Sequence, residues 1–194
     1  MKIIVIDNGS QYTHRIYRTL QDLKVETKIV PNTTPLEQIK DADALCFSGS
    51  GGLVSQGASM GNCPIYLEKF KGPILGMCAG HQLIGEFFGG KVRSASESDS
   101  GTPEYGKTEI IIDKHEGLFK GLPVKFAVWE SHNDEVSEIS PELELLAHSD
   151  TCAFEAIKHI SRPIYGVQFH PEVQHSQFGR EIYANFVHIA KTYK

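Results

Sequence analysis

Cysteine is scarce in this chain, and its spacing does not suggest a disulfide framework. The 194 residues include only Cys46, Cys63, Cys78 and Cys152, and no C-x-x-C pair. Residues 1–7 enter an apolar, strand-like run directly, without the basic flank, apolar core and small-residue cleavage site of an export signal. We therefore expect free thiols and a cytoplasmic protein in a reducing compartment.

Long apolar runs and an excess of basic charge are also lacking. No apolar stretch approaches the roughly 20 residues that a membrane-spanning helix requires. The chain has 19 Lys and Arg residues and 24 Asp and Glu residues, which gives a formal charge of -5. This balance argues against nucleic-acid binding and against a polybasic membrane attachment. The hydrophobic share of 40% is typical of a folded globular protein. We expect one domain over residues 1–194, without internal repeats or linkers. The charge balance indicates that its ligand is small.

The first half of the chain alternates between apolar runs rich in Ile and Val and stretches with helical periodicity. The predicted strands are 2–6, 25–30, 44–47 and 73–76; the predicted helices are 36–40, 65–70 and 81–88, with another around Ile16, Leu20 and Leu23. Residues 7–10 predict a turn and helix cap between the first strand and its helix. This order of elements predicts a parallel, doubly wound sheet.

The second half has more strands and fewer helices. Strands are predicted at 108–112, 124–128, 152–157 and 164–169, a surface loop at 93–106, and an amphipathic helix at 176–190. We expect these strands to extend the sheet in antiparallel fashion. The predicted fold class is therefore α/β, with an open, mostly parallel central sheet flanked by helices and an antiparallel extension in the C-terminal half.

The strongest chemical signal is the run Gly76-Met77-Cys78-Ala79-Gly80-His81-Gln82, between a short apolar strand and a helix. Glycines two residues before and after Cys78 relieve crowding in a sharp strand-to-helix turn that lifts the side chain into an exposed position. The helix N-terminus favours the thiolate, and the N–H of Ala79 points where charge would form on an attacked carbonyl. The alternative is a small buried cysteine between packing glycines.

His170 is the best candidate for the base that such a thiol needs. It follows the strand predicted at 164–169, and the carboxylate of Glu172 is near enough in the chain to accept the other imidazole N–H. For His170 alone, the alternative is a capped surface histidine. Together, the thiol of Cys78, the imidazole of His170 and the carboxylate of Glu172 follow compatible strand ends, which favours a catalytic set.

A metal site is a weaker interpretation of the same region. His170, Glu172 and His175 include the H-x-E pattern of zinc deaminases, but the P-C-x-x-C ligand pair of those enzymes is missing. We therefore expect no metal at the Cys78, His170 and Glu172 set. The other three cysteines are expected to fill core or loop space.

The run at 76–82, together with Gln168-Phe169-His170-Pro171-Glu172, resembles the class I glutamine amidotransferases, and the resemblance covers nearly the whole chain. That family has a flavodoxin-like fold and hydrolyses glutamine to glutamate and ammonia through a Cys, His and Glu triad. The resemblance implies that Cys78 forms a glutamyl thioester, His170 acts as general base and acid, and Glu172 orients His170. It also implies that Gln82 helps to bind glutamine.

Three further stretches, 7–12, 129–134 and 165–173, resemble the amidotransferase part of the GMP synthases. Family members of the anthranilate synthase type usually open with Asp-Asn-Tyr-Asp-Ser-Phe instead. The chain ends at Lys194, which implies a separate synthetase subunit that uses ATP and Mg²⁺ to activate XMP, and no cofactor in this chain. The alternatives are an amidotransferase for another acceptor, such as chorismate, and a non-catalytic regulatory module of the same fold.

The oxyanion segment departs from the family pattern. The family usually has Ser-Gly-Gly-Pro after its third strand, where this chain has Ser48-Gly49-Ser50-Gly51-Gly52-Leu53. The family's donor amide therefore corresponds either to Ser50 or to Gly52, and a flexible loop is the alternative for the glycines.

The resemblance also implies that Ser131, His132, Asn133 and Asp134 line the glutamine pocket. An Asx-type turn is one alternative for these residues. Contact of His132 and Asp134 with the partner subunit is another.

Overall fold

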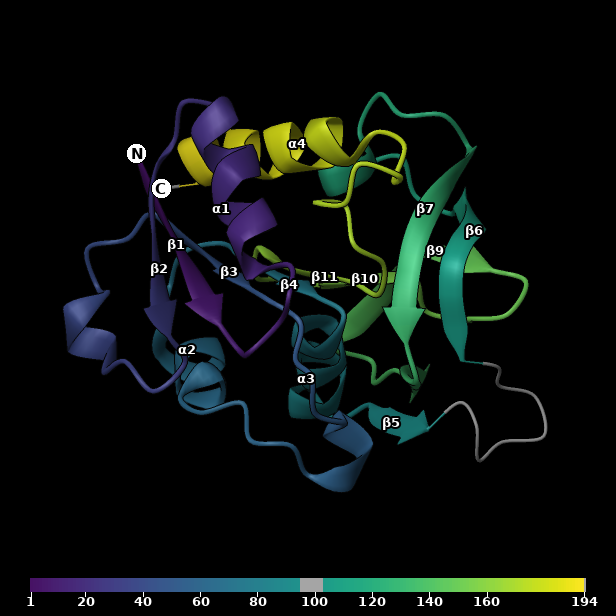
Figure 1. Cartoon of the computed structure of the whole chain (residues 1–194), viewed down its shortest axis with the longest axis horizontal. Helices are drawn as coiled ribbons and strands as arrows, with labels where there is room; N and C mark the ends of the chain where they lie inside the picture. Colours follow the sequence, from purple (N-terminus) through teal and green to yellow (C-terminus); the bar gives the residue numbers. More distant parts are fainter. Residues whose placement is uncertain (95–102, 194) are drawn as a thin grey trace.

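Nine strands form the central sheet of the protein, which a computed structural model describes at residues 1–94 and 103–193. They are β1 (Lys2–Asp7), β2 (Glu26–Pro31), β3 (Ala44–Phe47), β4 (Ile74–Met77), β6 (Glu104–Ile112), β7 (Lys125–His132), β9 (Leu143–Ser149), β10 (Ala156–His159) and β11 (Ile164–Val167). Their spatial order is β2-β1-β3-β4-β11-β10-β9-β6-β7. The first five in this order pair in parallel and the others antiparallel, which confirms the predicted fold class (Figure 1).

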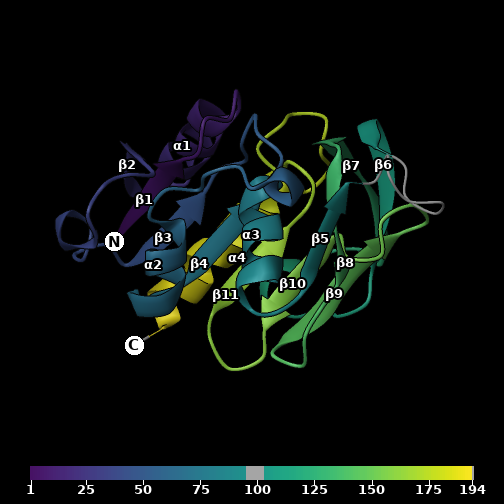
Figure 2. The same cartoon turned by 90° about the horizontal axis from the view of Figure 1, so that it is seen from below.

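Helices cover both faces of this sheet. α1 (Thr13–Asp22) and α4 (Gly179–Thr192) lie on one face, and α2 (Cys63–Lys69) and α3 (Ala79–Phe87) lie on the other (Figures 1 and 2). Ile3 and Val5 of β1 belong to the core under α1 and α4, whereas Ile4 and Ile6 belong to the core under α2 and α3. Alternate side chains of a strand point to opposite faces, so a fully apolar strand needs this cover on both sides.

Short 3₁₀ turns and a small second sheet are also present among the described residues. The turns are η1 (Leu36–Gln38), η2 (Val54–Gln56) and η4 (Gly117–Phe119), and β5 (Lys91–Ser94) pairs with β8 (Asp134–Glu138) in a two-stranded sheet. Among the helices that the structure describes, none is both long and apolar enough to serve as a membrane span.

The sheet topology brings two distant parts of the sequence side by side. β4 pairs in parallel with β11, with Gly76 opposite Gly166 and Met77 opposite Val167. Residues that follow these two strands therefore meet at one edge of the sheet. In open α/β sheets this carboxyl edge is where ligands bind.

Three strands were not predicted: β5, β8 and β9. Arg93 and Ser94 belong to β5, and Glu104–Gly106 opens β6, so the loop predicted over 93–106 is wrong at both ends; residues 95–102 lie outside the described residues. β8 was missed because its acidic sequence is untypical of a strand. Its buried carboxylate on Glu135 is paired with Arg93 at 2.8 Å across the small sheet.

Some predicted boundaries also move. The strand predicted at 152–157 occurs only from Ala156, because Cys152 closes a turn with Ser149, whose N–H donates to the Cys152 carbonyl at 2.9 Å. The closing helix begins at Gly179 and not at residue 176. The preceding Gln177 pairs with Ala127 of β7 through its N–H and its side-chain oxygen, each at 2.9 Å, and is therefore unavailable to start the helix.

Candidate active site

The turn from β4 to α3 holds Cys78 in a strained backbone conformation. Its φ of 51° and ψ of -111° lie in a region that residues other than glycine rarely adopt. The Cys78 N–H donates to the Val167 carbonyl at 2.9 Å, and the Gln82 N–H donates to the Cys78 carbonyl at 2.9 Å. The turn is thus tied to β11 on one side and to the first turn of α3 on the other, in the manner of a nucleophile elbow.

Gly76 and Gly80 permit this turn because neither position has room for a side chain. A Cβ at Gly76 would lie 2.5 Å from the carbonyl oxygen of Gly80, and a Cβ at Gly80 would lie 3.0 Å from that of Phe47. Both contacts are with backbone atoms, which cannot rotate away as a flexible side chain could. The two glycines therefore allow β3, β4 and α3 to approach one another closely.

The Cys78 thiol is less accessible than the sequence pattern predicts. Only 7% of the residue's surface is exposed, so the expectation of an exposed thiol is wrong. The end of β7 covers it: the Cys78 sulfur lies 3.9 Å from the carbonyl oxygen of Ser131. The thiol is consequently reached through a cavity and not from the open surface.

The imidazole of His170 is held beside this thiol by a buried carboxylate. His170 Nδ1 lies 2.7 Å from Glu172 Oε1, and the two side chains are 3% and 0% exposed. His170 follows β11 by three residues, which carries it to the turn at Cys78. The Tyr12 ring packs edge-on against the imidazole, with ring centroids 4.7 Å apart.

The charges in this group favour a protonated imidazole. Burial acts to lower the pKa of His170, but the negative charge of Glu172 and the hydrogen bonds with Cys78 and Glu172 outweigh burial and raise the pKa to about 10. His170 is therefore cationic at neutral pH. A cation beside a thiol stabilises the thiolate, which is the nucleophilic form of cysteine.

A cavity of about 380 Å³ opens onto the thiol. Of the residues expected in the site, those that line it are Gly49, Ser50, Gly51, Gly52, Cys78, Ala79, Gln82, Ser131, His132, Asn133, Asp134 and His170; Glu172 does not line it. The sequence-based prediction missed Leu53, Tyr105 and residues 9–12 as parts of the wall. The signal for residues 9–12 was their position directly after the first strand, at the same sheet edge.

Several polar side chains of this wall are engaged within the protein. Gln82 Nε2 donates to the carbonyl of Asp134 at 2.7 Å, and His132 Nδ1 lies 3.0 Å from the same oxygen. His132 and Asp134 are 4% and 2% exposed, so neither offers a surface contact to a partner. Ser131 and His132 end β7 and Asp134 begins β8, so only Asn133 lies between the two strands.

Comparisons with known proteins place the chain in a family. The pattern of the family described as Glutamine amidotransferase class-I matches residues 4–190. The chain belongs to the class I glutamine amidotransferases. This amidotransferase is 51% identical over 189 residues to a Pyrococcus abyssi protein named as a subunit of glutamine-hydrolyzing GMP synthase, with 95% of this chain and 96% of the relative covered.

Two further similarities span nearly the whole amidotransferase. An Archaeoglobus fulgidus protein of the same name is 47% identical over 191 residues, with 98% of this chain and 100% of the relative covered. The crystal structure of a Thermoplasma acidophilum protein described as a subunit of GMP synthase superposes with a TM-score of 0.93 at 41% identity, covering 100% of this chain and 95% of the other.

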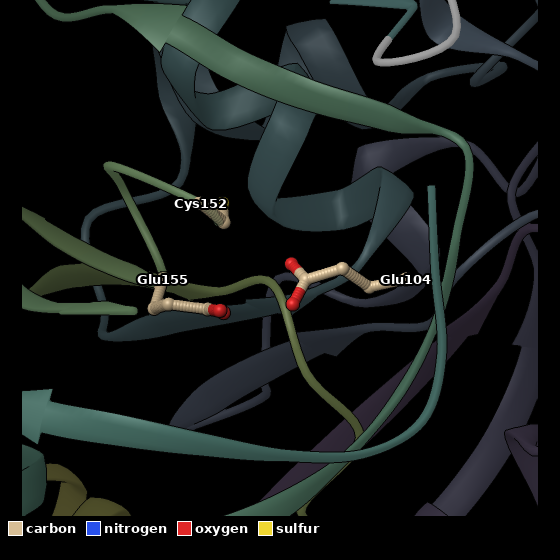
Figure 3. Close-up of side chains that lie close together, drawn as sticks. All are labelled: Glu104, Cys152 and Glu155. Atoms are coloured by element: carbon tan, nitrogen blue, oxygen red, sulfur yellow. The ribbon is translucent and has the colours of Figure 1, made fainter. Parts of the chain in front are cut away.

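The amidotransferase also buries a cluster of acidic groups next to the cavity wall. In Figure 3 the carboxyl groups of Glu104 and Glu155 point toward each other, with Cys152 close by. One ligand atom from each of these three residues lies within 4.8 Å of the other two. Burial raises the pKa values of Cys152, Glu155 and the neighbouring Glu130. Burial acts to raise the pKa of Glu104 as well, but hydrogen bonds with His132 and Thr151 outweigh it and lower that pKa. Cys152, Glu155 and Glu130 therefore hold their protons tightly, and a metal ion at the cluster would first have to displace them.

Replacing Glu155 by Gln removes one of these buried acids at nearly constant volume. Burial, followed by the charge of Glu104, raises the pKa of Glu155 above its ordinary value of 4.5, so the folded chain binds this proton more tightly than the unfolded chain. The unfolding free energy of the wild-type protein should therefore fall as the pH rises above 4.5, by up to about 1.4 kcal/mol per pH unit for this group. E155Q is expected to make that decline shallower.

Urea unfolding followed from acidic to alkaline pH checks this expectation. The control is E68Q, which changes an exposed glutamate on α2 and should follow the wild-type curve. Parallel curves for E155Q and the wild type would show that Glu155 does not hold its proton in the folded state.

Proposed function

We propose that this chain is the glutamine-hydrolysing subunit of a GMP synthase and delivers ammonia to a separate synthetase subunit. One observation supports the chemistry above all others: a single cavity brings together the Cys78 thiol, the His170 imidazole with its Glu172 partner, and the glycine-rich segment 49–52. The names of the relatives, which match over nearly their full length, support GMP synthesis as the use of the ammonia.

The reaction begins when the Cys78 sulfur attacks the side-chain amide carbon of glutamine. The His170 imidazolium, which its raised pKa of about 10 favours, already holds the proton, and the sulfur attacks as the thiolate beside it. The carbon–nitrogen bond of the tetrahedral intermediate then breaks as His170 transfers this proton to the departing nitrogen. Ammonia leaves, and a γ-glutamyl thioester remains on Cys78.

Water completes the cycle. The neutral His170 takes a proton from water as the water oxygen attacks the thioester carbonyl, and the proton passes to the sulfur when glutamate leaves. Glu172 accepts the Nδ1–H of His170 at 2.7 Å, which leaves the other ring nitrogen free to face the reacting atoms.

Backbone N–H groups stabilise the oxyanion in this proposal. Ala79 is the first residue of α3 and lines the cavity, and the first N–H groups of a helix have no partner within the helix. The second donor comes from segment 49–52. A Cβ at Gly49 would lie 3.4 Å from the Cys78 Cβ and 3.5 Å from the His170 Cε1, so this segment passes directly beside the reacting groups.

The synthetase subunit holds ATP and Mg²⁺ and activates XMP, and no cofactor is assigned to this chain. Free ammonia is quickly protonated in neutral water and is then no longer nucleophilic. We therefore expect hydrolysis to be slow in the isolated chain and faster when the synthetase subunit is docked and loaded, with both subunits in the cytoplasm.

Glutamine labelled with nitrogen-15 in its side-chain amide tests the whole proposal. With the synthetase subunit, ATP, Mg²⁺ and XMP present, we expect the label in the amino group of GMP, and glutamate release above that of the isolated chain. Labelled ammonium without this chain serves as the control for the synthetase. Transfer of the label to an aminated chorismate instead would assign another acceptor, and no glutamate release in either case would indicate a non-catalytic module.

A further inference from the structure

The carboxylate of Asp134 is directed at Ser55, although Asp134 lines the cavity. Ser55 donates its backbone N–H to Asp134 Oδ2 at 2.8 Å and its hydroxyl to Oδ1 at 2.9 Å. Asp134 is 2% exposed at the start of β8, whereas Ser55 is an exposed residue of η2, 79 positions away in the sequence. Both oxygens of a buried carboxylate are thus engaged by one residue outside the cavity wall.

Asp134 is itself held by the frame that carries the nucleophile. Its carbonyl accepts Gln82 Nε2 at 2.7 Å and lies 3.0 Å from His132 Nδ1. Gln82 belongs to the first turn of α3, and its N–H is bonded to the carbonyl of Cys78. Asp134 therefore has a fixed position relative to the Cys78 turn.

The glycine-rich segment runs beside the cavity between two anchors. At its start, the Ser48 hydroxyl accepts the N–H of Asn8 at 2.9 Å and the Ser48 carbonyl accepts Asn8 Nδ2 at 3.0 Å. At its end stands the pair of Ser55 and Asp134. Gly51 and Gly52 lie exposed between these anchors, where the Gly52 N–H donates to the Ser50 hydroxyl at 3.0 Å. Glycines allow the backbone many orientations, so the anchors decide which one this segment keeps.

We propose that Asp134 is a positioning residue that holds the amides of segment 49–52 toward the oxyanion through its two hydrogen bonds to Ser55. The inference rests on the proposed glutamine hydrolysis. Hydrogen bonds to an ionised carboxylate are about twice as strong as neutral ones, which suits an anchor for a backbone rich in glycine. A misplaced oxyanion donor lowers the rate of the chemical step and leaves substrate binding intact.

Steady-state kinetics of D134A, S55A and the double variant test this role. D134A is expected to lower kcat by roughly 10- to 100-fold, which approaches the loss of one oxyanion donor, with little change in KM. S55A should lower kcat in the same direction by less, and the double variant should be no worse than D134A, because both changes remove one interaction.

Two further variants refine the comparison. D134N is expected to rescue much of the rate, since its amide oxygen can accept the Ser55 N–H and its amide nitrogen can donate to the Ser55 hydroxyl. Q56A, which changes the next and exposed residue of η2, should leave kcat unchanged. If D134A instead raised KM while S55A behaved as wild type, Asp134 would bind the substrate and the inference would be wrong.

Amide hydrogen exchange supplies a readout that does not depend on turnover. Peptides that cover residues 49–57 should exchange faster in D134A than in the wild type, whereas iodoacetamide should alkylate Cys78 at the same rate in both. Unchanged exchange would overturn the inference. The two proposals can fail separately. If the wild-type protein showed no glutaminase turnover while D134A still exchanged faster than the wild type, the proposed function would be wrong and the anchoring role of Asp134 would stand.

Discussion

Replacing Cys78 by Ala is expected to abolish glutamine hydrolysis, with turnover falling by roughly 10⁴-fold or more. The sulfur is the atom that forms the thioester, and Cys78 is the cysteine among the described residues that line the cavity. The fold should persist, because Ala and Cys both carry a Cβ and therefore have similar backbone strain at a φ of 51°. The group that is lost is a single sulfur atom. Glutamate release measures the first effect and thermal unfolding the second.

C63A is the matched control for this change. Cys63 is fully buried in α2, and its sulfur lies 3.4 Å from Asn8 Oδ1, away from the cavity wall. This variant should retain its turnover and should accept one equivalent of an electrophilic glutamine analogue, whereas C78A should accept none. Substantial hydrolysis by C78A would remove Cys78 from the role of nucleophile.

Replacing Gly76 by Ala is expected to cost about 3 kcal/mol of unfolding free energy or more, the upper end of the usual cost of overpacking. The added Cβ would lie 2.5 Å from the carbonyl oxygen and 2.6 Å from the carbonyl carbon of Gly80. Relief requires α3 to move away from β4, and that movement shifts the turn at Cys78 between them. Hydrolysis should therefore be lost together with stability.

Urea unfolding compares this variant with G51A. A Cβ at Gly51 would have the Gly9 carbonyl oxygen at 3.9 Å as its nearest contact, so G51A should unfold at nearly the wild-type midpoint. If G76A and G51A unfolded alike, the close approach of β4 and α3 would not depend on a glycine.

The parallel half of the sheet could be predicted because its pattern is local. A run such as Ile3 to Ile6 indicates a strand buried on both faces, and the turn that follows indicates the next helix. The catalytic set could be proposed for a similar reason. The glycines around Cys78 and the spacing of His170 and Glu172 are short patterns, and parallel strands bring the two runs to one edge.

The features that the sequence did not predict depend on contacts between residues far apart in the chain. Glu135 is buried in β8 because Arg93 neutralises its charge. The sequence of residues 134–138 does not indicate this partner, so the strand could not be predicted. The accessibility of Cys78 was misjudged because Ser131, which covers it, lies 53 residues later. Asp134 was expected to line the glutamine pocket or to contact the partner subunit. Its bonds to Ser55 were not predicted, because nothing in the sequence indicates a contact between residues 79 positions apart.

β11 joins the two kinds of pairing in this sheet, and it comes after the other eight strands in the chain. It lies between β4, its parallel neighbour, and β10, its antiparallel neighbour. During synthesis on the ribosome, β1 to β4 emerge first, and they cannot be linked to the antiparallel strands until residues 164–167 have left the exit tunnel. His170 follows directly, so a nascent chain that has only reached Cys78 carries the thiol without its base. The order of synthesis therefore delays the reactive ion pair until the sheet around it can close.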